Sequence, residues 1–325
     1  MKVMTTVLSA LIVCLAACST SGNTANGNPG NDTAATITPP EFSGDSAYAL
    51  VERQCDFGPR VPGTDAHRKC GDWIEATLAA LCDTAVTQQA QVTTFDGKKL
   101  DIRNFIGTFN PEAGQRILLA AHWDCRPWAD KDPDPAKRNQ PVMGANDAAS
   151  GVAVLLELAR LMNAKQPNIG IDILITDAED WGSDGDENSW ALGTQYWAAN
   201  PHTPGYHATF GILLDMVGAK GARFAPEYFS TQYAPTFVQK VWSAASKAGF
   251  NAYFASDQGG AVTDDHIFIN TIAGIPCIDI IDMRPDNTEG GFFSAWHTTD
   301  DVISNIDTAT LRAVGQTITN VIYQY

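Results

Sequence analysis

Short runs of consecutive apolar residues alternate along the chain with longer segments in which apolar residues recur every three or four positions. Each continuous run predicts a strand that is buried on both faces. These runs are residues 116–121, 169–176, 210–216 and 274–281. The periodic segments predict helices at residues 150–162, 193–199, 235–248 and 308–323. Buried strands that alternate with helices are typical of an α/β fold, so we expect a mixed, mostly parallel central sheet with helices on both faces.

The part of the chain before these runs predicts two further helices and a hairpin. Apolar residues have helical spacing in two segments, residues 42–55 and 64–81. The dipeptide Asp96-Gly97 favours a two-residue hairpin turn, and its predicted arms are residues 86–95 and 100–109. Because no internal repeat or linker follows, we expect residues 42–325 to form a single domain.

The first residues have the pattern of an export signal rather than of a folded element. Lys2 precedes a short apolar run, and Leu15-Ala16-Ala17-Cys18 resembles a bacterial lipobox. Residues 1–17 are therefore expected to be a lipoprotein signal peptide, with Cys18 lipidated; a plain signal peptide with an incidental cysteine is the alternative. Residues 18–41 are rich in Ser, Thr, Asn and Gly and are expected to be a flexible tether. These features predict an exported bacterial lipoprotein that faces the periplasm and contacts the membrane only through its lipid.

Charge and cysteine content exclude two kinds of site. Lys and Arg number 21 against 37 Asp and Glu, a formal net charge of −16, so we expect no nucleic-acid partner. The spacings of the cysteines after the tether fit no CxxC metal pattern. They are Cys55, Cys70, Cys82, Cys125 and Cys277, an odd number, so at most two disulfides form; we expect the first three to lie close together.

Acidic residues and histidines follow every predicted buried strand or begin the helix after it. The segments that carry them are residues 122–124, 144–147, 177–180, 215 and 296–301. Ligands of open α/β sheets bind beyond the carboxyl ends of the strands, where these segments meet. Imidazole and carboxylates without thiolates are the ligand set of a catalytic zinc. A carboxylate beside a ligand, as Glu179 lies beside Asp180, suits a general base. No HExxH, GxSxG or GxxxxGK[ST] motif is present.

These segments resemble the zinc aminopeptidase superfamily, and within it the glutaminyl-peptide cyclotransferase (glutaminyl cyclase) family in its bacterial form. The resemblance covers nearly the whole chain after residue 42. The broader match rests on His122-x-Asp124, Gly144-Ala145-Asn146-Asp147-x-x-Ser150-Gly151, Glu179-Asp180, Leu214-Asp215-Met216-Val217-Gly218 and the late His297. The narrower match rests on Phe57-Gly58-Pro59-Arg60, Asp264-Asp265-His266 and Trp296-His297-Thr298-x-Asp300-Asp301.

The resemblance implies a role for each matching position. Asp147, Asp180 and His297 would bind one zinc ion, with Glu179 as general acid/base. Asp215 and Asp264 would form a carboxylate network with Glu179, and Trp296 would wall the pocket for the substrate's glutamine side chain. We expect this zinc-dependent acyltransferase to convert the N-terminal glutamine of peptides and proteins to pyroglutamate with release of ammonia, and its catalytic domain to be monomeric.

Three positions depart from the family pattern. Asp180 stands where many relatives have Glu, and Asp279 stands where animal cyclases have a histidine. The animal cyclases' second pocket tryptophan has no direct counterpart, and Trp190 or Trp181 is expected to replace it. We include Trp190 and Asp279 among the predicted substrate-binding residues.

Two other functions remain open at this point. A two-metal aminopeptidase would use His122, Asp147, Asp180, Asp215 and His297, all of which are present. We regard His122, Asp124 and His266 as ligands of a second metal or as residues that brace the site. An inactive lipid-anchored binding protein is the third possibility. The acidic loop 180–186 partly imitates a calcium loop but lacks its final acid.

Overall fold

The computed structural model describes residues 37–284 and 291–325. The predicted signal peptide, Cys18 and most of the predicted tether lie outside these residues. The last part of that tether, residues 37–41, contacts the folded body: Ile37 packs against the core, and Lys165 Nζ donates to the Thr38 carbonyl at 2.8 Å. Residues 37–41, which were expected to belong to the tether, are therefore part of the folded body. None of the helices in the described ranges has the length and hydropathy needed to span a membrane.

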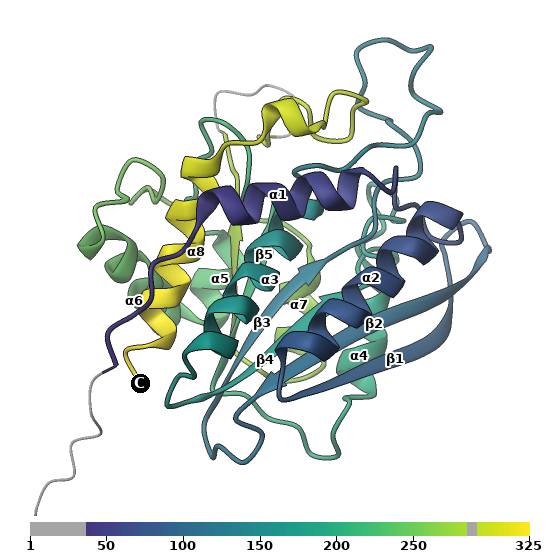
Figure 1. Cartoon of the computed structure of the whole chain (residues 1–325). Coiled ribbons are helices and arrows are strands. Elements are labelled where there is room, and N and C mark those ends of the chain that lie inside the picture. The colour runs from purple at the N-terminus through teal and green to yellow at the C-terminus, as the bar shows by residue number, and fades with distance from the viewer. Residues whose placement is uncertain (1–36, 285–290) are drawn as a thin grey trace, which may run out of the picture. The chain divides into compact units, whose positions relative to one another are not determined.

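The described strands form one mixed sheet in the order β1-β2-β4-β3-β5-β6 (Figure 1). They are β1 (Thr84–Thr93), β2 (Lys99–Phe109), β3 (Arg116–His122), β4 (Gly170–Thr176), β5 (Phe210–Asp215) and β6 (Cys277–Ile281). The last four run parallel to one another, whereas β2 pairs antiparallel with both β1 and β4. The predicted mixed, mostly parallel sheet and the hairpin are thus confirmed.

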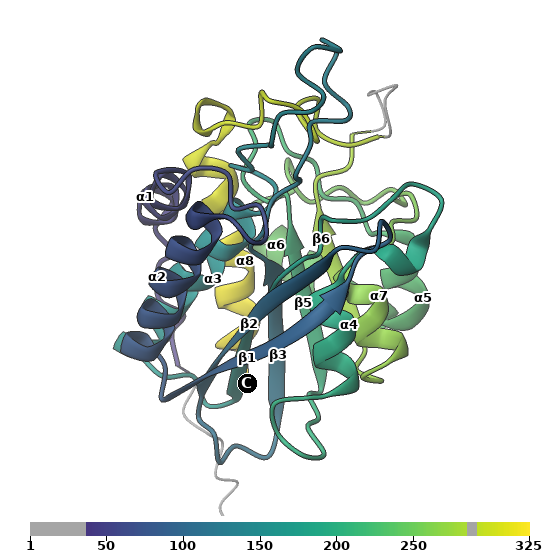
Figure 2. The ribbon, with the colours of Figure 1, turned by 90° about the vertical axis from the view of Figure 1, so that its right-hand side faces the viewer.

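Helices cover both faces of the sheet (Figure 2). One face carries α1 (Gly44–Cys55), α2 (Asp65–Leu81), α3 (Ala149–Ala164), α6 (Pro235–Lys247) and α8 (Thr308–Ile322). The other carries α4 (Leu192–Ala199) and α7 (Asp265–Thr271), with α5 (Tyr228–Tyr233) beside β6. Alternate residues of β3 enter the two cores: Ile117 and Leu119 face the first, and Leu118 faces the second. This explains why the strand reads as a continuous apolar run.

Sequence periodicity missed the two shortest helices and lengthened one strand. Six residues in α5 and seven in α7 are too few for a 3.6-residue pattern to emerge. The predicted strand 274–281 is shorter in the structure, where β6 begins at Cys277; Pro276, which has no N–H to donate, precedes it and accepts a hydrogen bond from Gly211 N at 2.8 Å.

The five cysteines of the body are all free. Cys55 and Cys70 both lie in the electrostatic environment of Arg60, but Cys82 lies against Gly107 of β2. Cys70 is in the first half of α2 and Cys82 follows its end, which separates them by about 18 Å along the helix axis. The expected cluster of three therefore reduces to Cys55 and Cys70.

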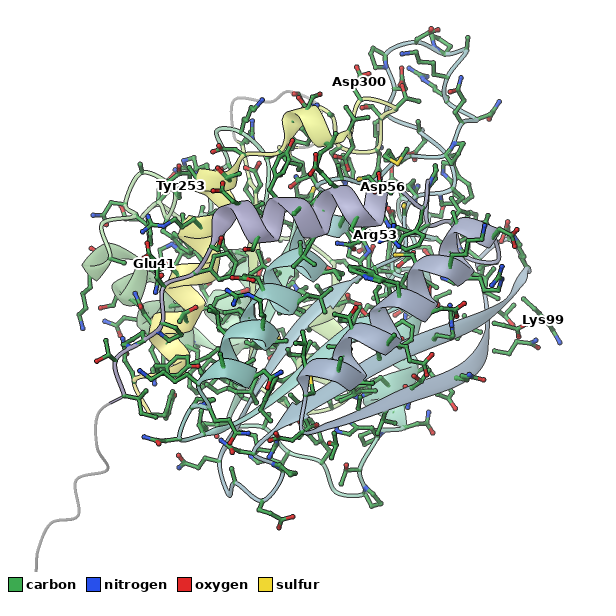
Figure 3. All side chains as sticks on the ribbon, viewed as in Figure 1. Glu41, Arg53, Asp56, Lys99, Tyr253 and Asp300 are labelled. Carbon is green, nitrogen blue, oxygen red and sulfur yellow. The ribbon has the colours of Figure 1, made fainter. Side chains whose placement is uncertain are left out.

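Charged side chains are distributed very unevenly between surface and interior. Those labelled in Figure 3, such as Glu41, Arg53, Lys99 and Asp300, lie exposed on the outside of the body. The carboxyl edge of the sheet is different: His122 ends β3, Asp215 ends β5, and both are buried. Many of the buried ionisable groups of the described residues thus lie at this edge.

Candidate active site

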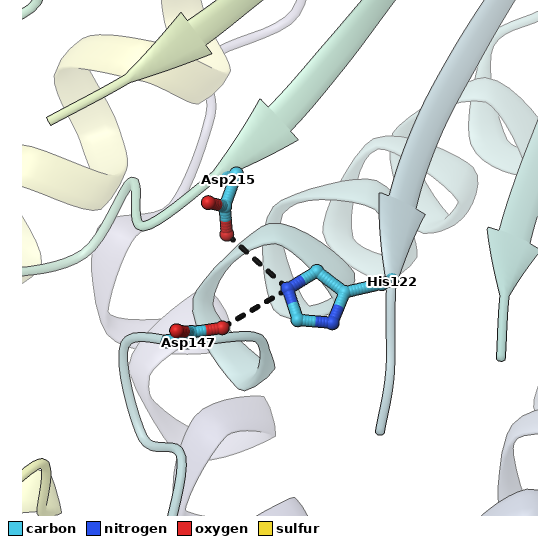
Figure 4. Close-up of side chains that lie close together, drawn as sticks. All are labelled: His122, Asp147 and Asp215. Atoms are coloured by element: carbon cyan, nitrogen blue, oxygen red, sulfur yellow. Dashed lines mark hydrogen bonds and ion pairs between the residues drawn. The ribbon is translucent and has the colours of Figure 1, made fainter. Parts of the chain in front are cut away.

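Three predicted ligand residues meet where β3, β5 and α3 converge (Figure 4). His122 Nε2 lies 3.0 Å from Asp147 Oδ1 and 3.3 Å from Asp215 Oδ1. The close approach of α3 to β5 depends on Gly151 of α3, because a Cβ at this position would lie 2.3 Å from the Leu214 carbonyl oxygen of β5. This close packing brings the start of α3, and with it Asp147, to the strand ends.

A second group of three side chains shares Asp147 with the first. His297 Nε2 lies 3.1 Å from Asp180 Oδ1 and 3.7 Å from Asp147 Oδ2. The two oxygens of Asp147 therefore face different groups, one with His122 and Asp215, the other with Asp180 and His297. In both groups the candidate ligand atoms lie within 4.8 Å of one another, and every residue is buried.

The second group fits a zinc ion. Neither carboxylate oxygen of Asp180 accepts a hydrogen bond from the described residues, although the side chain is only 1% exposed. Oδ1 has ion-pair contacts alone, with His297 at 3.1 Å and Arg126 at 3.6 Å, and a buried carboxylate oxygen that accepts no hydrogen bond is costly. One imidazole nitrogen and two carboxylates form a donor set that catalytic zinc sites use, with a position left for substrate.

Carboxylates behind the site bind the backbone of the ligand segments. Asp124 accepts hydrogen bonds from the N–H groups of Glu179 and Asp180 at 3.0 and 3.1 Å, and its Oδ1 lies 3.4 Å from His122 Nδ1. Asp301 accepts from the N–H groups of Asn146 and Asp147 at 2.8 and 3.1 Å. Asp124 thus braces the site, as one of its two predicted roles requires.

The carboxylates at the pocket floor hold their protons more tightly than usual. Burial raises the pKa of Glu179 well above its usual range; His122 opposes this, and the negative charges of Asp264 and Asp180 add to it. Burial, with the charge of Asp147, raises the pKa of Asp215 to about 6. Burial and Asp215 also raise the pKa of Asp264. Glu179 is thus suited to carry a proton near neutral pH.

A cavity of about 330 Å³ opens above these groups, and three aromatic residues line it. The Trp296 ring stacks on His297 with centroids 3.9 Å apart, and Phe292 packs against Trp296 at 4.8 Å. Trp190 stacks toward His297 from another side, with centroids 6.3 Å apart. The cavity also contacts Asp147, Glu179, Asp180, Asp215, Asp264 and His297.

Left-handed backbone conformations occur at three non-glycine positions around this floor. Ala178, Met216 and His297 have φ of 51°, 50° and 54°. Ala178 precedes Glu179, Met216 follows Asp215, and His297 is itself a candidate ligand. Such conformations are unfavourable for residues with a Cβ and cluster at functional sites.

Several predicted residues lie away from the cavity. Asp279 is fully buried and does not line it, so a direct contact with substrate does not fit this geometry. It lies beside Asp264 and His266, whose Nε2 is 3.2 Å from Glu227 Oε2. Trp181 packs edge-on against Trp128, and Trp190 is the tryptophan that enters the cavity.

The acidic loop 180–186 does not gather its carboxylates. Asp184 pairs with Lys131 Nζ at 2.7 Å, and the candidate metal-binding groups of the described residues include neither Asp184 nor Asp186. Sequence reasoning also missed Phe292, Asp301 and Glu227. Asp301 lies within the matched string Trp296–Asp301 and could have been singled out; Phe292 and Glu227 lie in no motif.

The chain is similar to a family of peptidases and to bacterial proteins of known structure. The sequence profile of peptidase family M28 matches residues 104–322. A glutaminyl cyclase of Bacteroides thetaiotaomicron is 49% identical, covers 89% of this chain and 100% of its own, and superposes with a TM-score of 0.85. A Zn-dependent exopeptidase of Parabacteroides distasonis is 50% identical, covers 89% and 100%, and has a TM-score of 0.87.

An animal relative shows the same similarity at lower identity. Glutaminyl-peptide cyclotransferase of Bos taurus is 25% identical over 253 residues, which cover 68% of this chain and 66% of the bovine protein. The chain thus matches about two thirds of the length of that relative. The chain belongs to peptidase family M28, and along the body of its sequence it is similar to the bacterial glutaminyl cyclases.

Proposed function

We propose that this protein is a zinc-dependent glutaminyl-peptide cyclotransferase that acts on peptides and proteins with an N-terminal glutamine. One observation carries the proposal: the half-buried Trp296 ring, stacked on His297, walls a small cavity that has Glu179 at its floor. A flat uncharged wall beside the ligand group suits an amide side chain that must curl toward its own amine. The similarity to bacterial glutaminyl cyclases at about half identity supports the same activity.

Asp147, Asp180 and His297 would hold the zinc ion. When bound there, zinc supplies Lewis-acid polarisation of the substrate's side-chain amide carbonyl. The floor of the cavity is acidic. Glu179 lies beside these three ligands but belongs to none of the candidate metal-binding groups.

In the proposed reaction the free α-amine of the substrate attacks its own side-chain amide carbon. A carbon–nitrogen bond forms in the new ring, the bond to the amide nitrogen breaks, and ammonia leaves. Glu179 accepts the proton that the amine releases and delivers it to the departing nitrogen. The neighbouring carboxylate of Asp264 helps Glu179 to hold this proton between the two steps, and Asp215 in turn raises the pKa of Asp264.

A two-metal aminopeptidase is the second candidate. The observation that favours it is the shared Asp147, because a bridging carboxylate between two ligand groups is what a two-metal site requires. His122 and Asp215 would then be ligands of the second ion. The relative from Parabacteroides distasonis, described as an exopeptidase, is as similar in sequence as the cyclases are.

One experiment separates these functions. The purified protein is given three peptides, which begin with glutamine, with N-acetylglutamine and with leucine, and mass spectrometry follows each. We expect the glutamine peptide alone to lose one ammonia, since the acetylated peptide has no free amine, and we expect about one zinc ion per chain. Shortening of the leucine peptide with about two zinc ions per chain would establish the aminopeptidase. No change in any peptide would favour an inactive binding protein.

We propose in addition that the protein is an exported lipoprotein whose Cys18 carries the membrane anchor. The sequence Leu15-Ala16-Ala17-Cys18 supports this. Replacing Cys18 by serine should move the protein from the membrane fraction to the soluble fraction without changing its catalytic constants. Retention of the Cys18→Ser variant in the membrane fraction would rule out this anchor.

A further inference from the structure

The guanidinium of Arg60 is buried beneath the ligand groups and binds backbone carbonyls. Arg60 is fully buried, and no ion pair of the described residues includes it. Its Nη1 donates to the Met143 carbonyl at 2.7 Å and its Nη2 to the Gly144 carbonyl at 2.5 Å. Its Nε donates to the Trp123 carbonyl at 3.4 Å. A buried cation without a carboxylate partner is costly, so its retention calls for an explanation.

The three carbonyls belong to two segments: one carries the ligand Asp147, and the other carries His122, whose Nε2 lies 3.0 Å from Asp147 Oδ1. Trp123 directly follows His122, and Met143 and Gly144 precede Asp147 by four and three residues. The backbone of Arg60 joins the same segments, because its N–H donates to Cys125 Sγ at 3.0 Å. Arg60 therefore ties the end of β3 to the loop that leads into α3.

The loop 144–147 is also held by the carboxyl group of Asp301. Asp301 accepts the N–H groups of Asn146 and Asp147, while Arg60 binds the carbonyls at the start of the same loop. The packing is tight: a Cβ on Gly144 would lie 2.3 Å from the Asp147 carbonyl oxygen and 3.0 Å from Arg60 Nη2. A guanidinium on carbonyls and a carboxylate on N–H groups leave this loop little freedom.

The segment that carries Glu179 and Asp180 is held in the same way. Asp124 accepts hydrogen bonds from the N–H groups of Glu179 and Asp180. Arg126 Nη1 donates to the carbonyls of Asp180 and Gly182 at 3.0 Å each. Arg126, however, also pairs with the Asp130 carboxylate. Arg60 is the one of the two guanidinium groups that forms no ion pair with a carboxylate among the described residues.

We propose that Arg60 is a positioning residue of the metal site: it sets the affinity for zinc and the rate of the reaction by fixing Asp147 relative to His122. This inference rests on the proposed function for the role of Asp147 as ligand. Groups behind metal ligands typically change metal affinity or activity by about 10–100-fold when removed. The fork of five N–H donors explains why arginine suits three carbonyls that lie in different directions.

The experiment compares Arg60→Met and Arg60→Lys with the control Arg116→Met. Arg116 is the first residue of β3, at the opposite end from His122, and it also bonds to backbone carbonyls. Zinc affinity is measured by chelator competition without substrate, together with kcat, KM and Tm. We expect Arg60→Met to bind zinc about 10–100-fold more weakly and to lose kcat rather than KM. Arg60→Lys should recover part of the affinity, because one ammonium reaches fewer carbonyls.

The control fixes the meaning of each outcome. Arg116→Met should lower Tm while leaving zinc affinity unchanged. If Arg60→Met lowers Tm to the same extent as Arg116→Met and keeps wild-type zinc affinity and kcat, Arg60 is structural only and the inference is overturned. If Arg60→Met does not fold, an Arg60→Lys variant with wild-type zinc affinity overturns it equally. Weakened zinc binding in a protein that cyclises no peptide would leave the inference standing and refute the proposed function instead.

Discussion

The two ends of β3 use ionisable groups in opposite ways. At the amino end, Arg116 meets Asp172 at 2.6 Å, and Tyr206 and Thr108 donate to the same carboxylate. At the carboxyl end, the buried oxygens of Asp180 and one oxygen of Asp264 have no hydrogen-bond partner among the described residues. The first arrangement is saturated and stabilises the fold. The second is left incomplete by the protein alone, which is what a site for a metal and a substrate requires.

The largest effect is expected from Glu179 at the carboxyl end. Glu179→Gln keeps the shape of the side chain but cannot exchange a proton, so turnover should fall by about 10²–10⁴-fold. Because burial raises the pKa of this carboxyl and disfavours its charge, Tm should not fall. Glu112→Gln, the same change at an exposed loop residue, serves as the control and should alter neither quantity. An active Glu179→Gln enzyme would remove Glu179 from the mechanism.

The amino end should respond in the opposite way. Asp172→Asn breaks a buried ion pair, which typically costs 3–5 kcal/mol; we expect about 3 kcal/mol because the Arg116 side chain keeps some exposure. Urea denaturation measures this loss of unfolding free energy. The kcat of the folded variant should equal that of the wild type, and a large fall in kcat would show that the two ends are not independent.

Removing the metal should affect only the carboxyl end. A ligand that binds the native state stabilises it by about 2.7 kcal/mol at a concentration of 100 times its Kd, so a chelator should lower the Tm of the protein. Asp180→Asn should abolish this response, whereas Asp172→Asn should retain it. Calorimetry with and without chelator checks both variants, and a chelator response that persists in Asp180→Asn would place the metal elsewhere.

The smallest effect concerns the pH dependence of stability at the amino end. Burial and the adjacent Asp172 raise the pKa of Tyr206 well above its usual value of 10.0. The folded state therefore holds this phenolic proton more tightly than the unfolded state, and the stabilisation is complete below pH 10 and is lost as pH rises above it. Urea denaturation between neutral and alkaline pH should show a steeper alkaline decline for wild type than for Tyr206→Phe. Parallel curves would contradict this.

Most of the fold could be predicted because its strands carry their own signal. Ile117 to Ala121 are buried on both faces, and a run of apolar residues expresses this directly. The candidate ligands were also accessible, since parallel strands end at one edge and place His122 and Asp215 there. Arg60 belongs to a matched string, but the sequence could not reveal its role, because it binds backbone carbonyls, which every residue has. It could not reveal that Asp279 lies behind Asp264, because strand position alone does not show which acid reaches the cavity.

The candidate site draws its residues from a long stretch of the chain, from His122 to His297, and the strands β4, β5 and β6 and the helices α3 to α7 lie between these two residues. No fragment that lacks either end of this span contains the complete set. Contacts between residues so distant in sequence form late in folding, and a metal that needs all of them binds only when the last has formed. Zinc binding would therefore show that folding is complete. A chain cut in a loop between His122 and His297 would bind zinc only after its two pieces had reassembled.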